Sequence, residues 1–313
     1  MYAVQIKEIK RRENISGFFH PPIRRKMRKD YDVIKQTFKA FIDTWKSRKT
    51  DELNEIVKPN VHAYFSAVKE ATDGGQHSSF GVKDFILDIP KTDEFEYAIC
   101  NYVCRIKGKD AQQVSEVACT AANHDGQYFK FIAVICNSWV KENDKWLISE
   151  MRVDIKHFES PLLEQFAETW HFEEPLAVLS GLVHLPCIFS EIDSPYAKIP
   201  VAEDLLTEEE KVEECFIKFN YGIDWIMYRY VKETLADDFK NDDKRHFIAY
   251  TKFANQRYRY TCHPYITKLI EINGNNAVGM FETVIPENAE MQVEFIKEKD
   301  KWQILSIESG QEG

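Results

Sequence analysis

Two ten-residue stretches of this chain are nearly the same: VKENDKWLIS at Val140–Ser149 and IKEKDKWQIL at Ile296–Leu305. Each reads as an apolar run, a charged segment that contains Asp-Lys, and a second alternating run that begins at a tryptophan. Polar turn residues between two alternating runs are typical of a tight turn between antiparallel strands. The sequence therefore predicts the same β-hairpin twice, and we expect each hairpin to close a domain of the same type.

The similarity continues upstream of both hairpins. VCRIKGKDA (Val103–Ala111) matches LIEINGNNA (Leu269–Ala277), and both read as strand, glycine-containing turn and strand. Further upstream, Phe38–Val61 and Cys215–Phe239 both carry apolar residues at helical spacing. Helices followed by a meander of long strands are typical of an α+β domain. Each half of the chain is therefore predicted to be α+β.

The length of 313 residues is enough for two domains of ordinary size. We expect an N-terminal extension over residues 1–30, a first domain over 31–158, a packed connector over 159–206 and a second domain over 207–313. Prolines along the connector break long elements, but the segment is too apolar for a flexible linker. A capping-box pattern at Thr207 marks the first helix of the second domain.

Composition excludes several classes of function. The formal net charge of −10 argues against broad nucleic-acid binding, because phosphate contacts need a basic surface. No apolar stretch is long enough for a membrane helix, and the N-terminus lacks the apolar run of a secretory signal. Seven scattered cysteines without a Cys-x-x-Cys pair are typical of reduced core thiols. We therefore expect a cytoplasmic protein with no metal, no membrane and no nucleic-acid partner.

The pattern resembles the nuclear-transport-factor-2-like, or SnoaL-like, superfamily, written twice. The stretches that carry the resemblance are FNYGIDWIMYRYVKETLADDF (Phe219–Phe239), YRYTCHPYITKLIEINGNNAVG (Tyr258–Gly279) and the two Lys-Trp hairpins. It leaves out the N-terminal extension and the connector. The resemblance implies two cone-shaped half-barrels, in each of which a curved antiparallel sheet wraps around helices and an apolar pocket.

The second copy resembles the scytalone dehydratase and bile-acid dehydratase branch of that superfamily. In this branch an Asp on the first helix faces a His at the start of a strand, which places Asp224 and His263 as the candidate catalytic pair. A carboxylate that bonds an imidazole fixes its tautomer and raises its basicity. The resemblance therefore implies a lyase or isomerase of dehydratase type, without a cofactor, that acts on a small apolar or polycyclic ligand.

Other interpretations of these residues stay open. Asp224 could be a polar residue on an amphipathic helix, and His263 could be a strand-edge histidine bonded to backbone. The dehydratases place tyrosines where this chain has Ile223 and Phe219, so the substrate does not carry over. Candidate pocket-lining residues are Phe219, Tyr221, Tyr228 and Tyr260. Whether the protein is an enzyme is open, and the alternative is a ligand-binding or assembly module of the same fold.

The first copy lacks the Asp–His pair at the matching positions. Alignment through the glycine turns puts Tyr97 where the second copy has His263, and alignment of the helices puts Lys46, or a residue close by, where it has Asp224. We expect a non-catalytic first domain that pairs with the second as an internal pseudo-dimer, and a homo-oligomer is left open. The basic cluster Pro21–Lys29 could bind an anionic ligand or latch onto an acidic patch of the same chain.

Overall fold

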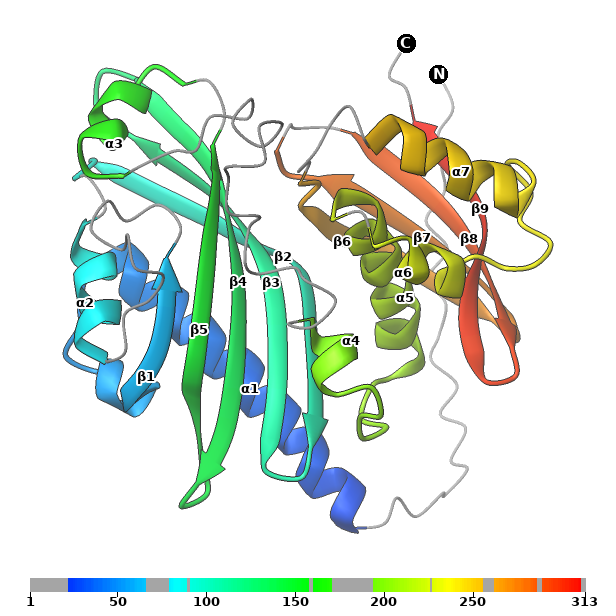
Figure 1. Cartoon of the computed structure of the whole chain (residues 1–313), viewed down its shortest axis with the longest axis horizontal. Helices are drawn as coiled ribbons and strands as arrows, with labels where there is room; N and C mark the ends of the chain where they lie inside the picture. Colours follow the sequence, from blue (N-terminus) through cyan, green and yellow to red (C-terminus); the bar gives the residue numbers. More distant parts are fainter. Residues whose placement is uncertain are drawn as a thin grey trace, which may run out of the picture.

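The computed structural model describes residues 22–65, 79–88, 91–157, 160–170, 194–225, 227–255, 262–285 and 289–310. Two β-sheets lie side by side, and each sheet follows helices in the chain (Figure 1). The fold class is the one predicted, α+β with two open, curved sheets that wrap around helices. No helix in these ranges is long and apolar enough to cross a membrane.

The first sheet has the strand order β1-β5-β4-β3-β2. Its strands are β1 (Val57–Phe65), β2 (Glu94–Lys107), β3 (Asp110–Ala122), β4 (Tyr128–Glu142) and β5 (Lys145–His157). The pairing is antiparallel except between β1 and β5, which run parallel. The helices of this half are α1 (Pro22–Ser47), η1 (Leu53–Glu55), α2 (Ser79–Asp88) and α3 (Leu163–Thr169).

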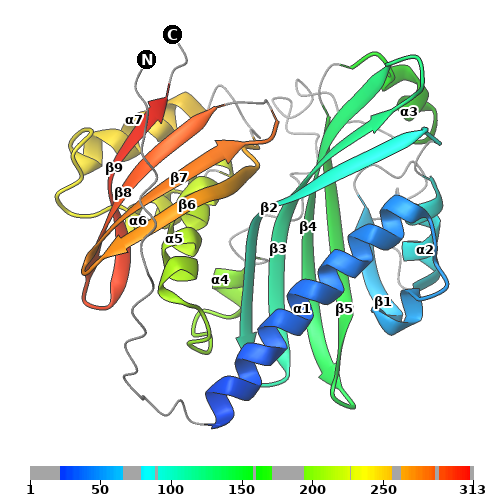
Figure 2. The same ribbon diagram turned by 180° about the vertical axis from the view of Figure 1, so that it is seen from behind.

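Helix α1 crosses one face of the first sheet (Figure 2). It contributes Phe38, Phe41 and Trp45, all buried, to the apolar core of the first half. The helix begins at Pro22, inside the segment predicted as an extension. Arg28 of the basic cluster bonds the Glu210 carboxylate, so the cluster does join two parts of the chain.

The second sheet is fully antiparallel, in the order β6-β7-β8-β9. Its strands are β6 (Tyr265–Asn273), β7 (Asn276–Thr283), β8 (Glu290–Glu298) and β9 (Lys301–Gly310). Helices α5 (Glu208–Asp224), α6 (Tyr228–Thr234) and α7 (Lys244–Asn255) come before it. Phe216 of α5 stacks on Phe281 of β7 with ring centroids 3.7 Å apart, which anchors this helix in the second core.

Both predicted hairpins are present, and they share their geometry. Asn143 and Asp144 have φ of 48° and 61°, and Lys299 and Asp300 have φ of 47° and 63°. Two successive residues with positive φ define the tight hairpin turn that matches the twist of the strands. The sequence predicted each turn at an Asp-Lys pair, and the two central residues of the turn are the Asp and the residue before it. The same turn geometry in both halves accounts for the repeat of this short polar pattern.

A strand irregularity also recurs at the matching place. The pairing of β4 with β5 shifts between Ser138 and Trp139, and the pairing of β8 with β9 shifts between Glu294 and Phe295. These positions correspond when Trp146 is aligned with Trp302. A bulge bends its strand, so the two sheets curve at the same point of their closing hairpins.

The two halves contact each other asymmetrically. The outer face of the first sheet packs against α5 and its flanking residues, with Val114 and Val134 on one side and Tyr221 and Trp225 on the other. A symmetric pseudo-dimer would use the same face of both halves. In the described part of the chain the first half offers its sheet, and the second half offers helix α5 together with residues of β6 and Ile285.

The connector packs along the same junction. Its helix α4 (Pro195–Lys198) follows Ser194, whose hydroxyl caps the helix and bonds the Tyr230 hydroxyl. Arg105 of β2 donates from Nε to the Ile199 carbonyl at 2.8 Å. The described part of the connector is therefore bonded to both halves.

Helices α5 and α6 approach closely at Gly222, two residues before the end of α5. A Cβ there would lie 2.7 Å from Val231 Cγ2 and 2.8 Å from the Val231 backbone nitrogen. Gly222→Ala should therefore lower the free energy of unfolding by about 2 kcal/mol, although alanine is the better helix former. Urea denaturation measures this, with the exposed Lys232→Ala as the control. A variant as stable as the wild type would contradict the close packing.

Candidate functional site

Asp224 and His263 form a hydrogen-bonded pair. Asp224 is the last residue of α5, and His263 lies two residues before β6. His263 Nδ1 is 2.5 Å from Asp224 Oδ1, and the His263 backbone nitrogen donates to Oδ2 at 2.9 Å. Both carboxylate oxygens are therefore used by one residue, and the two candidate catalytic residues lie together.

The start of α5 follows from its sequence. The Thr207 hydroxyl accepts from the Glu210 backbone nitrogen at 3.3 Å, and the Glu210 carboxylate accepts from the Thr207 nitrogen at 2.8 Å. This is the predicted capping box, and it satisfies two amides that the helix leaves open. The helix ends where Trp225 leaves the helical conformation, directly after Asp224. The carboxylate thus stands at a defined end of a rigid element.

The environments of the two partners differ. The Asp224 side chain is 0% exposed, whereas the His263 side chain is 39% exposed. Burial alone would lower the pKa of His263, but the hydrogen bond and the charge of Asp224 raise it above its ordinary value. No described residue bonds Nε2. The imidazole therefore has one nitrogen held by a buried carboxylate and one available to another molecule.

The first half of the chain also bonds His263, through the backbone carbonyl of the histidine. Asn101 of β2 donates from Nδ2 to the His263 carbonyl at 2.8 Å and to Glu116 Oε2 at 2.7 Å. Asn220 of α5 donates to the same carbonyl at 3.1 Å. Asn101 has φ of 47° at an irregularity of β2, a conformation that asparagine tolerates well. The sequence analysis missed this contribution of the first half.

Glu116 of β3 is a second carboxyl beside the pair. Its side chain is fully buried, and Oε2 accepts from Asn101 Nδ2 at 2.7 Å. Burial and the charge of Asp224 raise the pKa of Glu116 to about 8, although the hydrogen bond from Asn101 opposes the shift. Two neighbouring carboxyls in one apolar place do not both ionise readily. Glu116 therefore carries a proton at neutral pH.

The first half contains a related pair of its own. The Tyr97 hydroxyl donates to Asp43 Oδ1 at 2.5 Å, and Lys39 Nζ lies 2.8 Å from Asp43 Oδ2. Tyr97 is the residue that matches His263. The helix alignment put Lys46, or a residue close by, at the position of Asp224, and the residue that bonds Tyr97 is Asp43, three positions before Lys46. Burial and Asp43 raise the pKa of Tyr97. The phenol therefore stays protonated at neutral pH.

The predicted pocket-lining residues are dispersed. Phe219 is buried in the second core, with its ring centroid 6.2 Å from that of Phe247. Tyr221 is buried in the contact between the halves, where its hydroxyl donates to the Asn101 carbonyl. Tyr228 is partly buried at the start of α6. Tyr260 lies outside the described residues.

No group of three or more His, Cys, Asp or Glu side chains in the described ranges is arranged to hold a metal ion. The six cysteines in these ranges are buried free thiols.

No protein-family model and no curated protein matches this chain. Among solved structures, the hexachlorocyclohexane dehydrochlorinase LinA-type3 from Novosphingobium barchaimii is similar at 14% identity and a TM-score of 0.38, over 50% of this chain and 100% of that one. An NTF2-like protein of unknown function from Shewanella baltica is similar at 16% identity and a TM-score of 0.31, over 41% of this chain and 94% of that one. The CaMKII hub from S. rosetta is similar at 15% identity and a TM-score of 0.35, over 40% of this chain and 95% of that one. Similarity at this level does not establish an activity.

Glu116 should make the stability of the protein depend on pH. The unfolded chain loses this proton near its ordinary pKa of 4.5, whereas the folded protein keeps it up to about pH 8. The unfolded state therefore binds fewer protons in this window, and stability falls as the pH rises through it. Glutamine does not ionise, so Glu116→Gln should not lose stability as the pH rises. At pH 8 the free energy of unfolding of the variant should exceed that of the wild type by about 2–4 kcal/mol.

Urea denaturation between pH 5 and pH 8 measures the difference. Glu96→Gln, at an exposed position of the neighbouring strand β2, serves as the control and should follow the wild type. Parallel pH profiles for Glu116→Gln and the wild type would show that Glu116 is already ionised in the folded protein.

Proposed function

We propose that this protein is a lyase or isomerase that needs no cofactor, in which His263 transfers a proton and Asp224 positions it. The observation that carries the proposal is the 2.5 Å contact between a fully buried carboxylate and a partly exposed imidazole. This arrangement orients one ring nitrogen and stabilises the imidazolium that forms when the other nitrogen takes a proton. Asp224 acts through His263, so its role is that of a positioning residue.

The proposed reaction begins at a carbon next to a carbonyl group. His263 Nε2 takes the proton, the C–H bond breaks, and its electron pair moves toward the carbonyl as an enolate. In a dehydration the electron pair then forms a carbon–carbon double bond, the C–O bond of a β-hydroxyl breaks, and the imidazolium returns its proton so that water leaves. In an isomerisation the imidazolium returns the proton to another carbon.

The ligand that we propose is small and apolar or polycyclic. The rings of His263 and Tyr265 are inclined by 24°, with centroids 6.3 Å apart, but Tyr265 is buried in the second core. The exposed part of the imidazole is therefore the surface that we propose a ligand meets. The alternative function, ligand binding without turnover, uses the same surface.

Substitution of the pair tests the reaction. Steroid-like and polyketide-like compounds are screened by thermal shift, and the compounds that bind are assayed for turnover. His263→Ala and Asp224→Asn should each lower the rate about 100-fold to 10,000-fold, the usual contribution of a positioned acid or base. Asp43→Asn, the matched change in the Asp43–Tyr97 pair, should leave the rate unchanged. Turnover that survives both substitutions would rule out the pair as the catalyst.

The electrostatic half of the proposal is testable without a substrate. Asp224→Asn removes the charge that raises the pKa of His263, so burial should dominate and the pKa should fall below that of the wild type. Titration of the imidazole resonances by NMR measures this shift, and Asp43→Asn is again the control. An unchanged pKa of His263 in Asp224→Asn would show that the carboxylate does not tune the imidazole.

A further inference from the structure

Asn101 occupies an irregularity of β2 that lies against the second half. The pairing of β2 with β3 shifts between Cys100 and Val103, and both of these residues pack against the second half. Residues three apart share one face of a strand only when the strand holds an extra residue. Asn101 has φ of 47° in this bulge and is 3% exposed. The bulge therefore takes Asn101 out of the strand alternation and brings it into the contact between the halves.

The amide of Asn101 joins a carboxyl of the first half to the proposed base of the second half. Nδ2 lies 2.7 Å from Glu116 Oε2 and 2.8 Å from the His263 carbonyl oxygen. A side-chain amide nitrogen carries two hydrogens, which is one for each of these acceptors. Asn101 therefore bonds His263 to the first sheet without giving up its bond to Glu116.

The backbone of His263 is fixed on both sides of its Cα atom. Its nitrogen donates to Asp224 Oδ2 at 2.9 Å, and its carbonyl accepts from Asn101 and, at 3.1 Å, from Asn220. The ring is fixed as well, because Nδ1 lies 2.5 Å from Asp224 Oδ1. With the backbone and one ring nitrogen held, the direction of Nε2 is defined before a ligand arrives.

A matching irregularity occurs in the second sheet. The pairing of β6 with β7 shifts between Thr267 and Leu269, which is the same place in the alignment through the glycine turns. In that alignment Glu282 matches Glu116. Lys268 lies in the bulge, and its Nζ is 2.6 Å from Glu282 Oε2. Both bulges therefore supply a side chain that bonds the carboxyl of the next strand.

The two bulges differ in burial and in charge. The Lys268 side chain is 51% exposed, whereas Asn101 is covered by the second half. An ammonium group in that buried position would be costly, because it would lose its solvent. A neutral amide avoids this cost, and its second hydrogen bonds the His263 carbonyl. The residue type at the first bulge therefore fits the contact with His263 as well as the bond to a carboxyl.

We propose that Asn101 is a positioning residue for the reaction proposed above, and that it acts through His263 from the first half of the chain. Its effect on a rate rests on that reaction, but its effect on the imidazole can be measured without a substrate. Asn101 touches no reacting atom, so its loss should change the chemical step more than the binding of a ligand.

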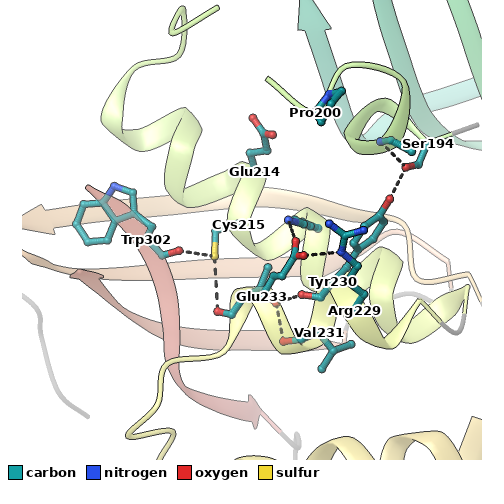
Figure 3. Close-up of polar contacts among 12 residues, drawn as sticks. Ser194, Pro200, Glu214, Cys215, Arg229, Tyr230, Val231, Glu233 and Trp302 are labelled. Carbon is teal, nitrogen blue, oxygen red and sulfur yellow. Dashed lines mark hydrogen bonds and ion pairs between the residues drawn. The ribbon is translucent and has the colours of Figure 1, made fainter. Parts of the chain in front are cut away.

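Other contacts hold the halves together, so the removal of one amide should leave them assembled. Arg105 of β2 pairs with Glu214 of α5 at 2.9 Å. The Ser194 hydroxyl of the connector bonds the Tyr230 hydroxyl of α6 (Figure 3). The change Asn101→Gly leaves both contacts in place, and glycine adopts a positive φ without strain.

The tautomer of His263 is the first measurement. In the wild type the bond to Asp224 should keep the hydrogen of the neutral imidazole on Nδ1. The two ring nitrogen resonances, measured by NMR, should then be far apart. In Asn101→Gly they should move toward each other, because a less fixed ring also populates the tautomer with its hydrogen on Nε2. Lys268→Ala removes the matching bond of the second sheet and should leave both resonances at their wild-type positions.

The rate is the second measurement. On a compound that the wild type turns over, Asn101→Gly should lower kcat by about 10-fold to 100-fold, the cost of a displaced catalytic group, with little change in KM. Lys268→Ala should keep the wild-type rate. If Asn101→Gly does not fold, Asn101→Asp makes the same comparison, because aspartate also tolerates a positive φ and its carboxylate cannot donate.

The two measurements separate two failures. Unchanged nitrogen resonances of His263 in the Asn101 variant would show that Asn101 does not position the histidine, and this would overturn the inference. Resonances that move as expected, together with turnover that survives His263→Ala, would show that the proposed reaction is wrong although Asn101 orients the ring.

Discussion

The buried carboxylate of Asp224 is the constraint on which the site depends. An ionised carboxylate without solvent exposure is costly unless its oxygens are bonded, and here both oxygens accept from His263. This arrangement ties the end of α5 to the start of β6. Asn101 then bonds the carbonyl of the same histidine from the first sheet. The orientation of the imidazole is therefore a property of both halves of the chain, and neither half holds it alone.

The parts of the structure that the sequence predicted are those determined by local chemistry. Each repeated hairpin depends on two adjacent turn residues with positive φ, and the capping box at Thr207 depends on one residue three positions later. The pairing of Asp224 with His263 was different, because it followed from a resemblance and not from spacing. In the first copy the helix alignment gave Lys46, or a residue close by, and the structure has Asp43 bonded to Tyr97. Lys46 and Asp43 are three apart and share one side of a helix, so periodicity cannot choose between them.

The residues that the sequence analysis missed lie in the contact between the halves. Glu116 sits in a long strand between Val114 and Val117, and such a carboxylate normally points to solvent from one face of a sheet. It is buried because the second half covers that face, and Asn101 bonds His263 for the same reason. Contacts between segments so far apart in the chain leave no periodic pattern in the sequence. The sequence indicated this contact only by placing one acidic residue, Glu116, among apolar strand residues.

The two halves differ in what their matched pairs can do. Both place a carboxylate from a helix against a ring at the start of a strand, Asp43 with Tyr97 and Asp224 with His263. Burial and the nearby carboxylate raise the pKa of the phenol, which already lies far above neutral pH, so this ring keeps its proton. The imidazole begins near neutral pH, and the same kind of partner keeps it within reach of a change in charge. Asp43 is 49% exposed and pairs with Lys39, whereas Asp224 is fully buried, so the two pairs differ in burial as well as in ring type.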